Sequence, residues 1–324
     1  MTKRIAVCSP IVQAEMLDAL RTIPGLECIS CTPHELPAHA NQVDALVLAA
    51  FHYTPALAAS LAAPSSHCRW IQLLTAGYET LEEIGIADGI QISNAGNVWS
   101  PCVAEHAMAL LLGLARRFRR IETAQRAAEW DNHIRNDMLS LYGSRLLIVG
   151  MGHIGREVAK RARAFGMTVS GVSRFGRVDG QADVMYAASQ LTEAIRAADA
   201  IVLAVPSSAA THHLFGREEL AACSPQTLIV NVARGNVIDP DALADALEHN
   251  RIGGAALDVT EPEPLPTDSP LWRLPNVIIS PHLGGAAPAG YYRRLVDHVA
   301  RNAAAFAIGA PVQTITVTWQ FSAE

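Results

Sequence analysis

Short apolar runs recur along the chain and alternate with stretches whose apolar residues are spaced for one face of a helix. Near the start, runs at 4–8, 45–49 and 69–74 predict strands, and the segments near 12–22 and 55–62 predict helices. The alternation returns later and predicts further strands at 146–149, 167–172, 200–205, 227–232, 254–259 and 276–280. This order is typical of parallel sheets covered by helices on both faces, so we expect an α/β protein with two doubly wound sheets.

The helical segments between and after these runs indicate the domain organisation. Residues 103–120 predict a long helix, with a polar continuation to about 135, after a loop-like stretch at 90–101. Asp239 and Pro240 are typical of the N-cap and first position of a later helix. A final helix near 289–308 and the tail 312–319 exceed what the second sheet needs. The predicted domains are therefore residues 1–98 completed by 288–324, and residues 99–287.

Composition and charge exclude several classes of protein. The net charge of −6 argues against a nucleic-acid partner, and we interpret the basic run Arg116–Arg120 as the solvated end of a helix. The apolar run 107–115 is too short to span a bilayer, and the N-terminus begins a strand without a signal-peptide pattern. Of six cysteines only Cys28 and Cys31 have C-x-x-C spacing, which is weak evidence for zinc or redox chemistry. We expect a cytoplasmic protein with reduced thiols, no metal and no membrane partner.

Gly150, Gly152 and Gly155 form a G-x-G-x-x-G motif at the end of the strand 146–149. Apolar residues at helical spacing follow the motif, so it lies between a strand and a helix. Glycines there allow a tight turn and close approach of a pyrophosphate, which then lies at the helix N-terminus. The alternative is an ordinary Gly-rich turn. The strand–motif–helix context favours a dinucleotide-binding loop.

Three later segments place ionisable residues after predicted strands: Arg234, Glu263 and His282. Ligands of open α/β sheets bind at the carboxyl ends of the strands. Arginine can hold a carboxylate through two hydrogen bonds, and a histidine paired with a carboxylate can act as an acid or base. Reduction of a 2-oxo acid requires this combination. From the residues alone, Glu261 competes with Glu263 for the histidine, and Arg234 or His282 can also be ordinary surface or packing residues.

Together these motifs resemble the D-isomer-specific 2-hydroxyacid dehydrogenase family over essentially the whole chain. The segments that carry the resemblance are the glycine motif, NVARGNVID (231–239), ALDVTEPEP (256–264), PLW (270–272) and SPHLGG (280–285). The resemblance implies a Rossmann dinucleotide-binding domain and a smaller flavodoxin-like substrate domain. It also implies that Arg234 orients the substrate, that His282 is the acid–base residue and that Glu263 is its partner.

The resemblance further implies a set of binding residues. Ala76 and Gly77 correspond to the loop that binds the substrate carboxylate, and Asn97–Val98 to a segment that lines the nicotinamide pocket. Residues 206–211 correspond to a loop near the cofactor, with His212 and His213 as loop residues beyond it. The implied cofactor-binding residues are Gly150, Gly152, His153, Ile154, Gly155, Ser173, Arg174, Arg177, Val205, Pro206, Thr211, Val232, Ala233, Asp258, His282 and Gly284. Asp258 can equally be a structural cap.

One position departs from the family pattern and bears on the cofactor. Many members have an acidic residue after the second strand of the nucleotide domain, where it binds the ribose hydroxyls of NAD. Here Ser173 occupies that position, and Arg174 and Arg177 follow it. A hydroxyl and a guanidinium favour a 2′-phosphate, whereas a carboxylate repels one. We therefore predict a preference for NADP, with NAD possible.

The predicted activity is hydride transfer from NAD(P)H to C2 of a small 2-oxo acid, of the glyoxylate/hydroxypyruvate type, to give a D-2-hydroxy acid. One alternative is a dinucleotide-sensing, corepressor-like binding protein. Another is a dehydrogenase of a bulkier 2-hydroxy acid, whose pocket aromatic residues would shape: Phe51, Tyr53, Tyr78, Trp99 and Tyr291. By analogy with the family we expect a homodimer, with the apolar helix 103–115 and its basic continuation as a plausible contact.

Overall fold

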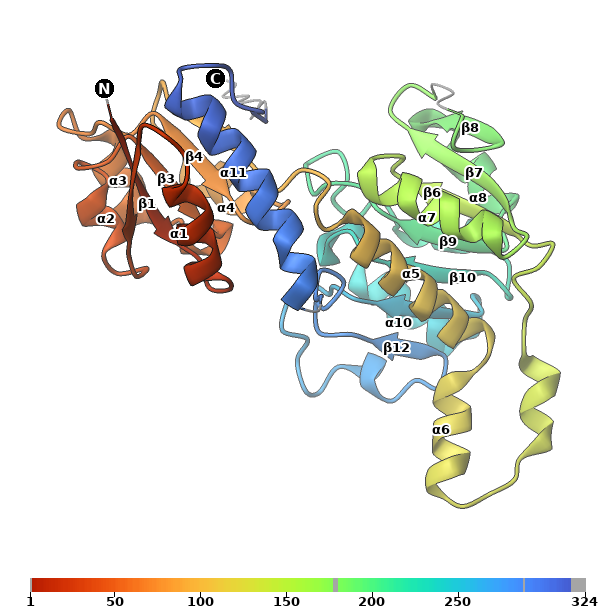
Figure 1. Ribbon diagram of the computed structural model, residues 1–324. Helices are drawn as coiled ribbons and strands as arrows, with labels where there is room; N and C mark the ends of the chain where they lie inside the picture. Colours follow the sequence, from red (N-terminus) through yellow and green to blue (C-terminus); the bar gives the residue numbers. More distant parts are fainter. Residues whose placement is uncertain (1, 177–179, 288, 316–324) are drawn as a thin grey trace. The chain divides into compact units, whose positions relative to one another are not determined.

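The computed structural model describes residues 2–176, 180–287 and 289–315. It divides into two compact units (Figure 1). The first consists of the chain up to Trp99 together with the chain from Ala287 onward, and the second is Ser100–Ala286. Arg177 and the end of the 312–319 tail lie outside the described residues. Each unit contains one parallel sheet, which confirms the predicted α/β class.

The first unit has a five-stranded sheet in the order β2-β1-β3-β4-β5, with every neighbouring pair parallel. This is the flavodoxin-like strand order. Its strands are β1 (Lys3–Cys8), β2 (Leu26–Ser30), β3 (Ala45–Leu48), β4 (Trp70–Leu73) and β5 (Gln91–Ser93). Its helices are α1 (Gln13–Arg21), α2 (Leu36–His39), α3 (Pro55–Ala62), α4 (Glu79–Ile84) and α11 (Arg293–Ala307), with 3-10 turns at Ala50–His52 and Ala289–Tyr292.

Helices cover both faces of this sheet. The apolar residues of α1 and α11 pack with Ile5, Val7 and Trp70 on one face. Those of α2, α3 and α4 pack with Ala6 and other strand residues on the opposite face. The final helix, from a segment far away in the sequence, therefore completes the core of the first unit, as Figure 1 shows.

The sequence pattern missed the two edge strands of this sheet, β2 and β5. In β2 the side chains are only partly buried or exposed, so the strand lacks a continuous apolar run. β5 has three residues and lies within the stretch that we expected to be a loop. Both strands are therefore defined by backbone pairing, β2 with β1 and β5 with β4, and not by a long apolar run.

The second unit has a seven-stranded sheet in the order β12-β11-β10-β9-β6-β7-β8. Counted from β6, this is the Rossmann order 3-2-1-4-5-6 with one further strand. The strands are β6 (Arg145–Val149), β7 (Thr168–Ser173), β8 (Val184–Ala187), β9 (Ala200–Leu203), β10 (Leu228–Asn231), β11 (Gly254–Leu257) and β12 (Val277–Ile279). The helices are α5 (Ser100–Ala115), α6 (Phe118–Arg126), α7 (His153–Ala164), α8 (Leu191–Arg196), α9 (Arg217–Ala222) and α10 (Pro240–Glu248), with 3-10 turns at Asn132–Asp137, Ala188–Gln190, Gly235–Val237 and Pro270–Trp272.

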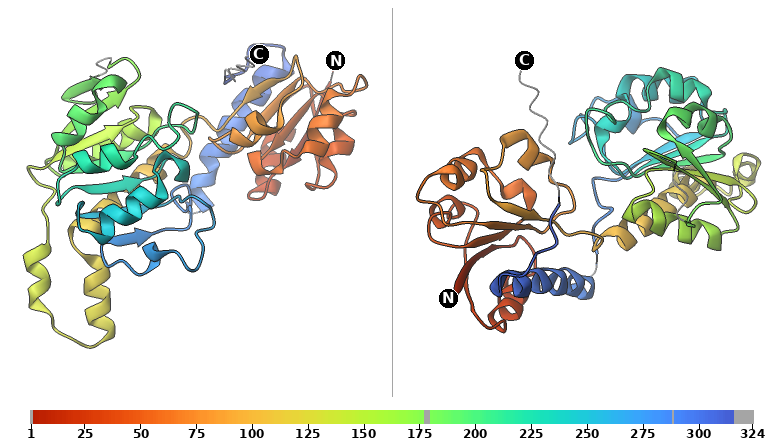
Figure 2. Two further views of the ribbon diagram at one scale, coloured as in Figure 1. Left: turned by 180° about the vertical axis from the view of Figure 1, so that it is seen from behind. Right: turned by 90° about the horizontal axis from the view of Figure 1, so that it is seen from above.

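Successive residues of the central strand β6 point to opposite faces of this sheet. Leu146 and Ile148 pack with α5 and α7, whereas Leu147 and Val149 pack with α8, α9 and α10. The two layers of helices are visible in Figures 1 and 2. The sheet is buried on both faces, which explains why its central strands are continuous apolar runs. Asp239 caps α10, as predicted, by accepting from the amides of Asp241 and Ala242.

The long helix predicted at 103–120 is interrupted. α5 ends at Ala115 and α6 begins at Phe118, because Arg117 adopts the left-handed backbone conformation with φ 58°. The prediction that Arg116–Arg120 is solvated was also wrong for two residues. The Arg117 guanidinium donates to the carbonyls of Asp137 and Gly253, and Arg119 donates to those of Val277 and Trp272.

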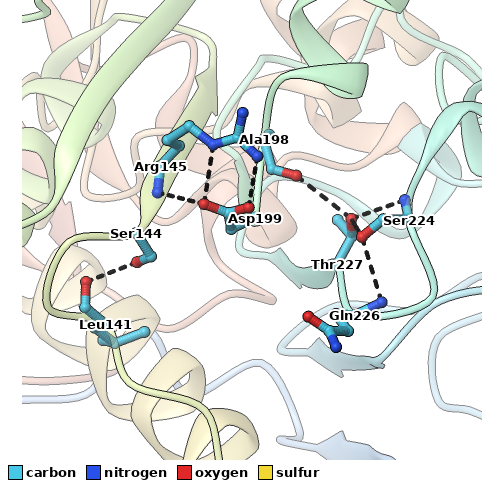
Figure 3. Close-up of polar contacts among 8 residues, drawn as sticks. All are labelled: Leu141, Ser144, Arg145, Ala198, Asp199, Ser224, Gln226 and Thr227. Atoms are coloured by element: carbon cyan, nitrogen blue, oxygen red, sulfur yellow. Dashed lines mark hydrogen bonds and ion pairs between the residues drawn. The ribbon is translucent and has the colours of Figure 1, made fainter.

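Two polar clusters lie at the amino ends of the central strands (Figure 3). Arg145 at the start of β6 forms a two-point ion pair with Asp199, whose carboxylate also accepts from the Arg145 amide at 2.8 Å. The hydroxyl of Thr227, just before β10, contacts Ser224 and the Ala198 carbonyl. These contacts align the amino ends of β6, β9 and β10 and leave the opposite, carboxyl edge of the sheet for a ligand.

The glycine motif occupies the turn from β6 into α7, and two of its glycines are required there by close packing. A Cβ on Gly155 would lie 2.1 Å from the Gly150 carbonyl oxygen. A Cβ on Gly150 would lie 2.5 Å from the Ala204 carbonyl oxygen, and Gly150 also has φ 105°. Gly152, by contrast, has nothing within 4 Å of its Cβ position and an ordinary φ of −78°. The first and third glycines therefore allow helix, strand and neighbouring loop to meet.

Gly155→Ala should destabilise the second unit, because the added methyl group must displace backbone. We expect a loss of about 1–3 kcal/mol in the free energy of unfolding, measured by urea denaturation. Gly152→Ala is the matched control and should change stability by less than about 0.5 kcal/mol. Equal stabilities of the two variants would contradict the packing argument.

Candidate active site

The three ionisable residues predicted at strand ends lie in loops at the carboxyl edge of the second sheet. Arg234 follows β10, Glu263 lies in the loop after β11, and His282 follows β12. Because β10, β11 and β12 are parallel neighbours, their carboxyl ends lie side by side. The three residues are far apart in the sequence, and the pairing of these strands brings their loops to the same edge of the sheet.

His282 and Glu263 are in direct contact. Nδ1 of the imidazole lies 2.7 Å from Oε1 of the carboxylate, and the two side chains are 50% and 42% exposed. The carboxylate therefore orients the ring and leaves Nε2 for another partner. Glu261, the competing candidate, pairs instead with His213, whose Nε2 lies 2.9 Å from Glu261 Oε2. The structure thus resolves which glutamate accompanies His282.

The loop that carries His282 is anchored by Asp258. The Asp258 carbonyl accepts from the His282 amide at 2.8 Å, and the carboxylate accepts from the amides of Leu283 and Gly284, each at 2.8 Å. The Ser280 hydroxyl donates to the same carboxylate at 2.7 Å. His282 itself has φ 55°, a conformation that a non-glycine residue rarely adopts. We infer that the contacts with Asp258 hold this loop in place.

His106 completes the network from the buried side of α5. Its Nε2 lies 3.1 Å from Asp258 Oδ1 and 2.9 Å from the Ser280 hydroxyl. Burial raises the pKa of the Asp258 carboxyl, but the hydrogen bonds from His106, Ser280, Gly284 and Leu283 outweigh burial and lower the pKa to about 2. The contacts of His106 and Ser280 with Asp258 were not predicted from the sequence. The sequence did offer one sign of His106, a histidine next to the apolar run 107–115. A histidine in that position is often only a packing residue.

Asp258 has both carboxylate oxygens engaged within the protein, as expected of a structural anchor. It is 4% exposed. Its predicted contact with the cofactor stays a prediction. Gly284 is buried against the same carboxylate, because a Cβ there would lie 2.7 Å from Asp258 Oδ2.

Arg234 is half-buried and is held by its neighbours. Asn231 donates to its carbonyl at 2.9 Å, and its own guanidinium donates to the Ala233 carbonyl at 2.7 Å. The following residue, Gly235, packs so closely on the next loop that a Cβ would lie 1.9 Å from the Thr260 carbonyl oxygen. Arg234 therefore lies on a loop that packs against the segment leading to Glu263.

The turn from β6 into α7 fits a dinucleotide. Gly152 caps α7 without a side-chain hydrogen bond, and the space at its Cβ position is open. His153 and Ile154 begin the helix, whose first amides have no earlier helical carbonyl to bind. These features match a pyrophosphate site, where backbone N–H groups and the positive end of the helix dipole face the anion.

Other predicted cofactor residues end or follow strands of the same sheet. The Gly150 amide donates to the Val172 carbonyl at 3.0 Å, so Ser173, the last residue of β7, lies close to the glycine loop. Arg174 is exposed and its guanidinium lies 6.0 Å from the centre of the Phe175 ring. The rest follow β9 or β10: Val205, Pro206, Thr211, Val232 and Ala233. Thr211 closes its own loop by donating to the Pro206 carbonyl at 2.7 Å.

Ala76 and Gly77 follow β4 in the first unit. The Ala76 carbonyl accepts from the Asn94 side chain at 2.7 Å, and the Gly77 carbonyl accepts from the Thr75 hydroxyl at 2.8 Å. A peptide N–H points away from the carbonyl of the same peptide, so the Gly77 amide is directed away from Asn94. Their substrate-binding role stays a prediction. Tyr53 is a core residue at 1% exposure and donates to the Gly85 carbonyl, so it does not shape a substrate pocket.

Comparisons with known proteins identify the family. Residues 108–284 match the family model of the D-isomer specific 2-hydroxyacid dehydrogenase NAD-binding domain. A glyoxylate reductase of Thermococcus gammatolerans is 35% identical over 74% of this chain and 73% of its own length. A glyoxylate/hydroxypyruvate reductase B of Pectobacterium carotovorum is 35% identical over 66% of this chain and 68% of its own length. A D-isomer-specific 2-hydroxyacid dehydrogenase family structure from Aeromonas salmonicida superposes with a TM-score of 0.85 at 30% identity, covering 97% of this chain and 98% of that one.

The site and the fold define an oxidoreductase with a nicotinamide dinucleotide-binding domain. The chain belongs to the D-isomer-specific 2-hydroxyacid dehydrogenase family, as its motifs predicted. In the part of the chain that the structure describes, no helix is both long and apolar enough to cross a membrane.

The anchoring role of Asp258 predicts a specific loss of stability in acid. Its pKa is lower in the folded protein than the usual 3.8, so the ionised carboxylate stabilises the fold above pH 4 and this contribution is lost as the pH falls toward 2. The full contribution is about 2 kcal/mol, and about half of it is lost by pH 3. Urea unfolding of wild type and Asp258→Asn at pH 6 and pH 3 measures this. The difference in stability between the two proteins should narrow at pH 3, and a constant difference would show that the carboxylate is not anchored through its charge.

Proposed function

We propose that the protein reduces glyoxylate, hydroxypyruvate or a similarly small 2-oxo acid to the D-2-hydroxy acid, preferring NADPH. The observation that carries the proposal is the His282–Glu263 pair at the carboxyl edge of the sheet, beside the loop of Arg234. The reductases named above support the choice of substrate. When bound, the dinucleotide supplies the hydride that reduces C2.

In this proposal His282 supplies the proton that the carbonyl oxygen of the substrate gains. Nδ1 contacts Glu263, so the proton is donated from Nε2. Glu263 fixes the ring orientation through its contact with Nδ1. Asp258, Ser280 and His106 are positioning residues, because they hold the loop of His282.

Arg234 is proposed to bind the substrate carboxylate and to stabilise the oxyanion that develops on the carbonyl oxygen. The amide of Gly77 is proposed to donate a further hydrogen bond to the carboxylate. A planar guanidinium can make both contacts with a 2-oxo acid, whereas a lysine provides only a point charge. Of the five aromatic residues named for a bulkier substrate, Tyr53 is part of the core and cannot shape such a pocket.

His282→Gln should lower kcat with glyoxylate at least about a hundredfold, because glutamine cannot deliver the proton, while the Kd for NADPH stays nearly unchanged. Steady-state kinetics at saturating NADPH and a fluorescence titration of NADPH measure the two quantities. His249→Gln is the matched control, because His249 is also exposed and paired with a carboxylate, that of Asp245. Near-normal turnover by His282→Gln would exclude the proposed role. A dinucleotide-sensing protein would instead bind NADPH with negligible turnover even in the wild type.

The proposed preference for NADPH rests on Ser173 and Arg174. Ser173 ends β7 next to the glycine loop, where an acidic residue would bind the ribose hydroxyls of NAD. Arg174 is exposed beside it, and its guanidinium is proposed to bind a 2′-phosphate. The predicted contribution of Arg177 lies outside the described residues.

Arg174→Ala should lower the ratio of kcat/KM for NADPH to that for NADH by about tenfold, equivalent to one screened contact with the phosphate. The kcat/KM for NADH itself should change little, because NADH has no 2′-phosphate. An unchanged ratio would show that Arg174 does not contact the cofactor.

We also propose a homodimer, with the basic continuation of the apolar helix 103–115 as its contact. Most apolar residues of α5 are buried within the second unit, so this helix offers little apolar surface to a partner. α6 and the turn Asn132–Asp137 instead extend away from the sheet (Figure 1). They form an open groove of about 580 Å³ with apolar lining residues Ile121, Ala124, Ala128, Trp130, Ile134 and Met138. Trp130 is 91% exposed, and a second copy of this arm would bury it.

Trp130→Asp should shift the mass in solution from twice that of the chain to that of a single chain, because a carboxylate in the apolar groove opposes burial. Size-exclusion chromatography with light scattering measures the mass. Phe51→Asp is the control, since Phe51 is also an exposed aromatic residue but belongs to the first unit. If the Trp130→Asp variant is still a dimer at low micromolar concentration, the interface lies elsewhere.

The predicted cytoplasmic location remains a proposal. All six cysteines are free thiols, as in a reducing compartment.

A further inference from the structure

His212, His213 and Glu261 form a cluster that the reduction chemistry does not use. Each offers one ligand atom, and the three atoms all lie within 4.8 Å of one another. His213 Nε2 is 2.9 Å from Glu261 Oε2, and the two imidazole rings stack with their centres 4.0 Å apart. Within the described ranges this is the one group of three or more histidine, cysteine or acidic side chains with such spacing.

The backbone that presents these ligands is held in place before any ion binds. The amide of His213 donates to the Asn236 carbonyl at 2.7 Å, and the amide of Phe215 donates to the Val237 carbonyl at 3.0 Å. The Phe215 side chain is fully buried and anchors the loop after β9. Glu261 follows Thr260, the residue against which Gly235 packs. Both ligand-bearing loops are therefore tied to the same third loop, which reduces the cost of bringing the ligands together.

We propose that this cluster binds a divalent transition-metal ion, with zinc as the expected occupant. Two imidazoles and one carboxylate form a ligand set that zinc accepts in tetrahedral sites with an open fourth position. The cluster is partly exposed, with His213 and Glu261 at 36% and 37%, so water can complete the coordination. Mg²⁺ and Ca²⁺ prefer oxygen ligands, and two imidazoles disfavour them.

A bound ion would link the loop after β9 to the loop after β11. Glu261 stands two residues before Glu263, the partner of His282, so the link would restrain the segment that carries Glu263. The His213–Glu261 hydrogen bond would be replaced by two bonds to the metal. We expect zinc to raise the thermal unfolding midpoint, because an ion that binds only the folded protein stabilises it.

The test is a Zn²⁺ titration of protein stripped with a chelator, in competition with a chromophoric zinc indicator. Wild type should bind one equivalent with a micromolar or lower Kd, and His212→Ala and Glu261→Gln should each weaken binding at least about tenfold. His249→Ala is the matched control, because His249 contacts the carboxylate of Asp245 but is not part of the cluster. Its affinity for zinc should equal that of wild type.

Co²⁺ provides a second readout that separates this site from the free cysteines. Binding at the cluster should produce weak visible d–d bands without the strong near-ultraviolet band of cobalt–thiolate bonds, and His212→Ala should remove the visible bands. Thiolate bands, or equal zinc affinity in wild type and His212→Ala, would overturn the proposal, as would an absence of binding below millimolar zinc. His212 is exposed, so the alanine variant should retain the fold, and its thermal unfolding without zinc verifies this. The titration uses neither dinucleotide nor 2-oxo acid, so its outcome is independent of the proposed reaction.

Discussion

The carboxylate of Asp258 is the contact on which the geometry of the site depends. It is buried at the end of β11 and receives hydrogen bonds from two amides of the His282 loop, from Ser280 and from His106. A charge in that position is costly unless its oxygens are satisfied, and here they are. The same contacts that compensate for burying the charge also hold His282 in its unusual backbone conformation.

Close backbone approach is the second constraint. Gly155 allows α7 to begin against β6, and Gly235 allows the Arg234 loop to pack on the segment that leads to Glu263. A side chain at either position would separate elements that the site requires to be adjacent. Glycine is therefore used for its absence of volume at least as much as for its backbone freedom.

Two glutamates that are close in the sequence contact different histidines in the fold. Glu261 and Glu263 lie in one short loop, yet one faces His213 and the other His282. The first pair joins the cluster proposed to bind zinc, and the second is proposed to serve proton transfer. Parallel strands with a short loop after each one place several such side chains at a single edge, and the loop packing selects their partners.

The sequence by itself determined the α/β class, the strand–glycine–helix turn and the strand-end positions of Arg234, Glu263 and His282. These features have local signatures: apolar runs for buried strands, glycines at fixed spacing and ionisable residues after a strand. It also identified the family, because several such segments occur in one order. The edge strands β2, β5 and β8 and the break at Arg117 were not predicted from such signatures.

Only the tertiary structure showed which side chains of the site contact each other. The His282–Glu263 contact, which the family resemblance implied but spacing alone left open against Glu261, joins residues distant in the chain. So does the link from His106 on α5 to Asp258, just after β11. The same holds for the contact of His213 with Glu261, and for the burial of most apolar residues of α5 within the second unit. Each depends on how loops and helices pack on the sheet, and a side chain's type and spacing along the chain do not specify which group it will meet there.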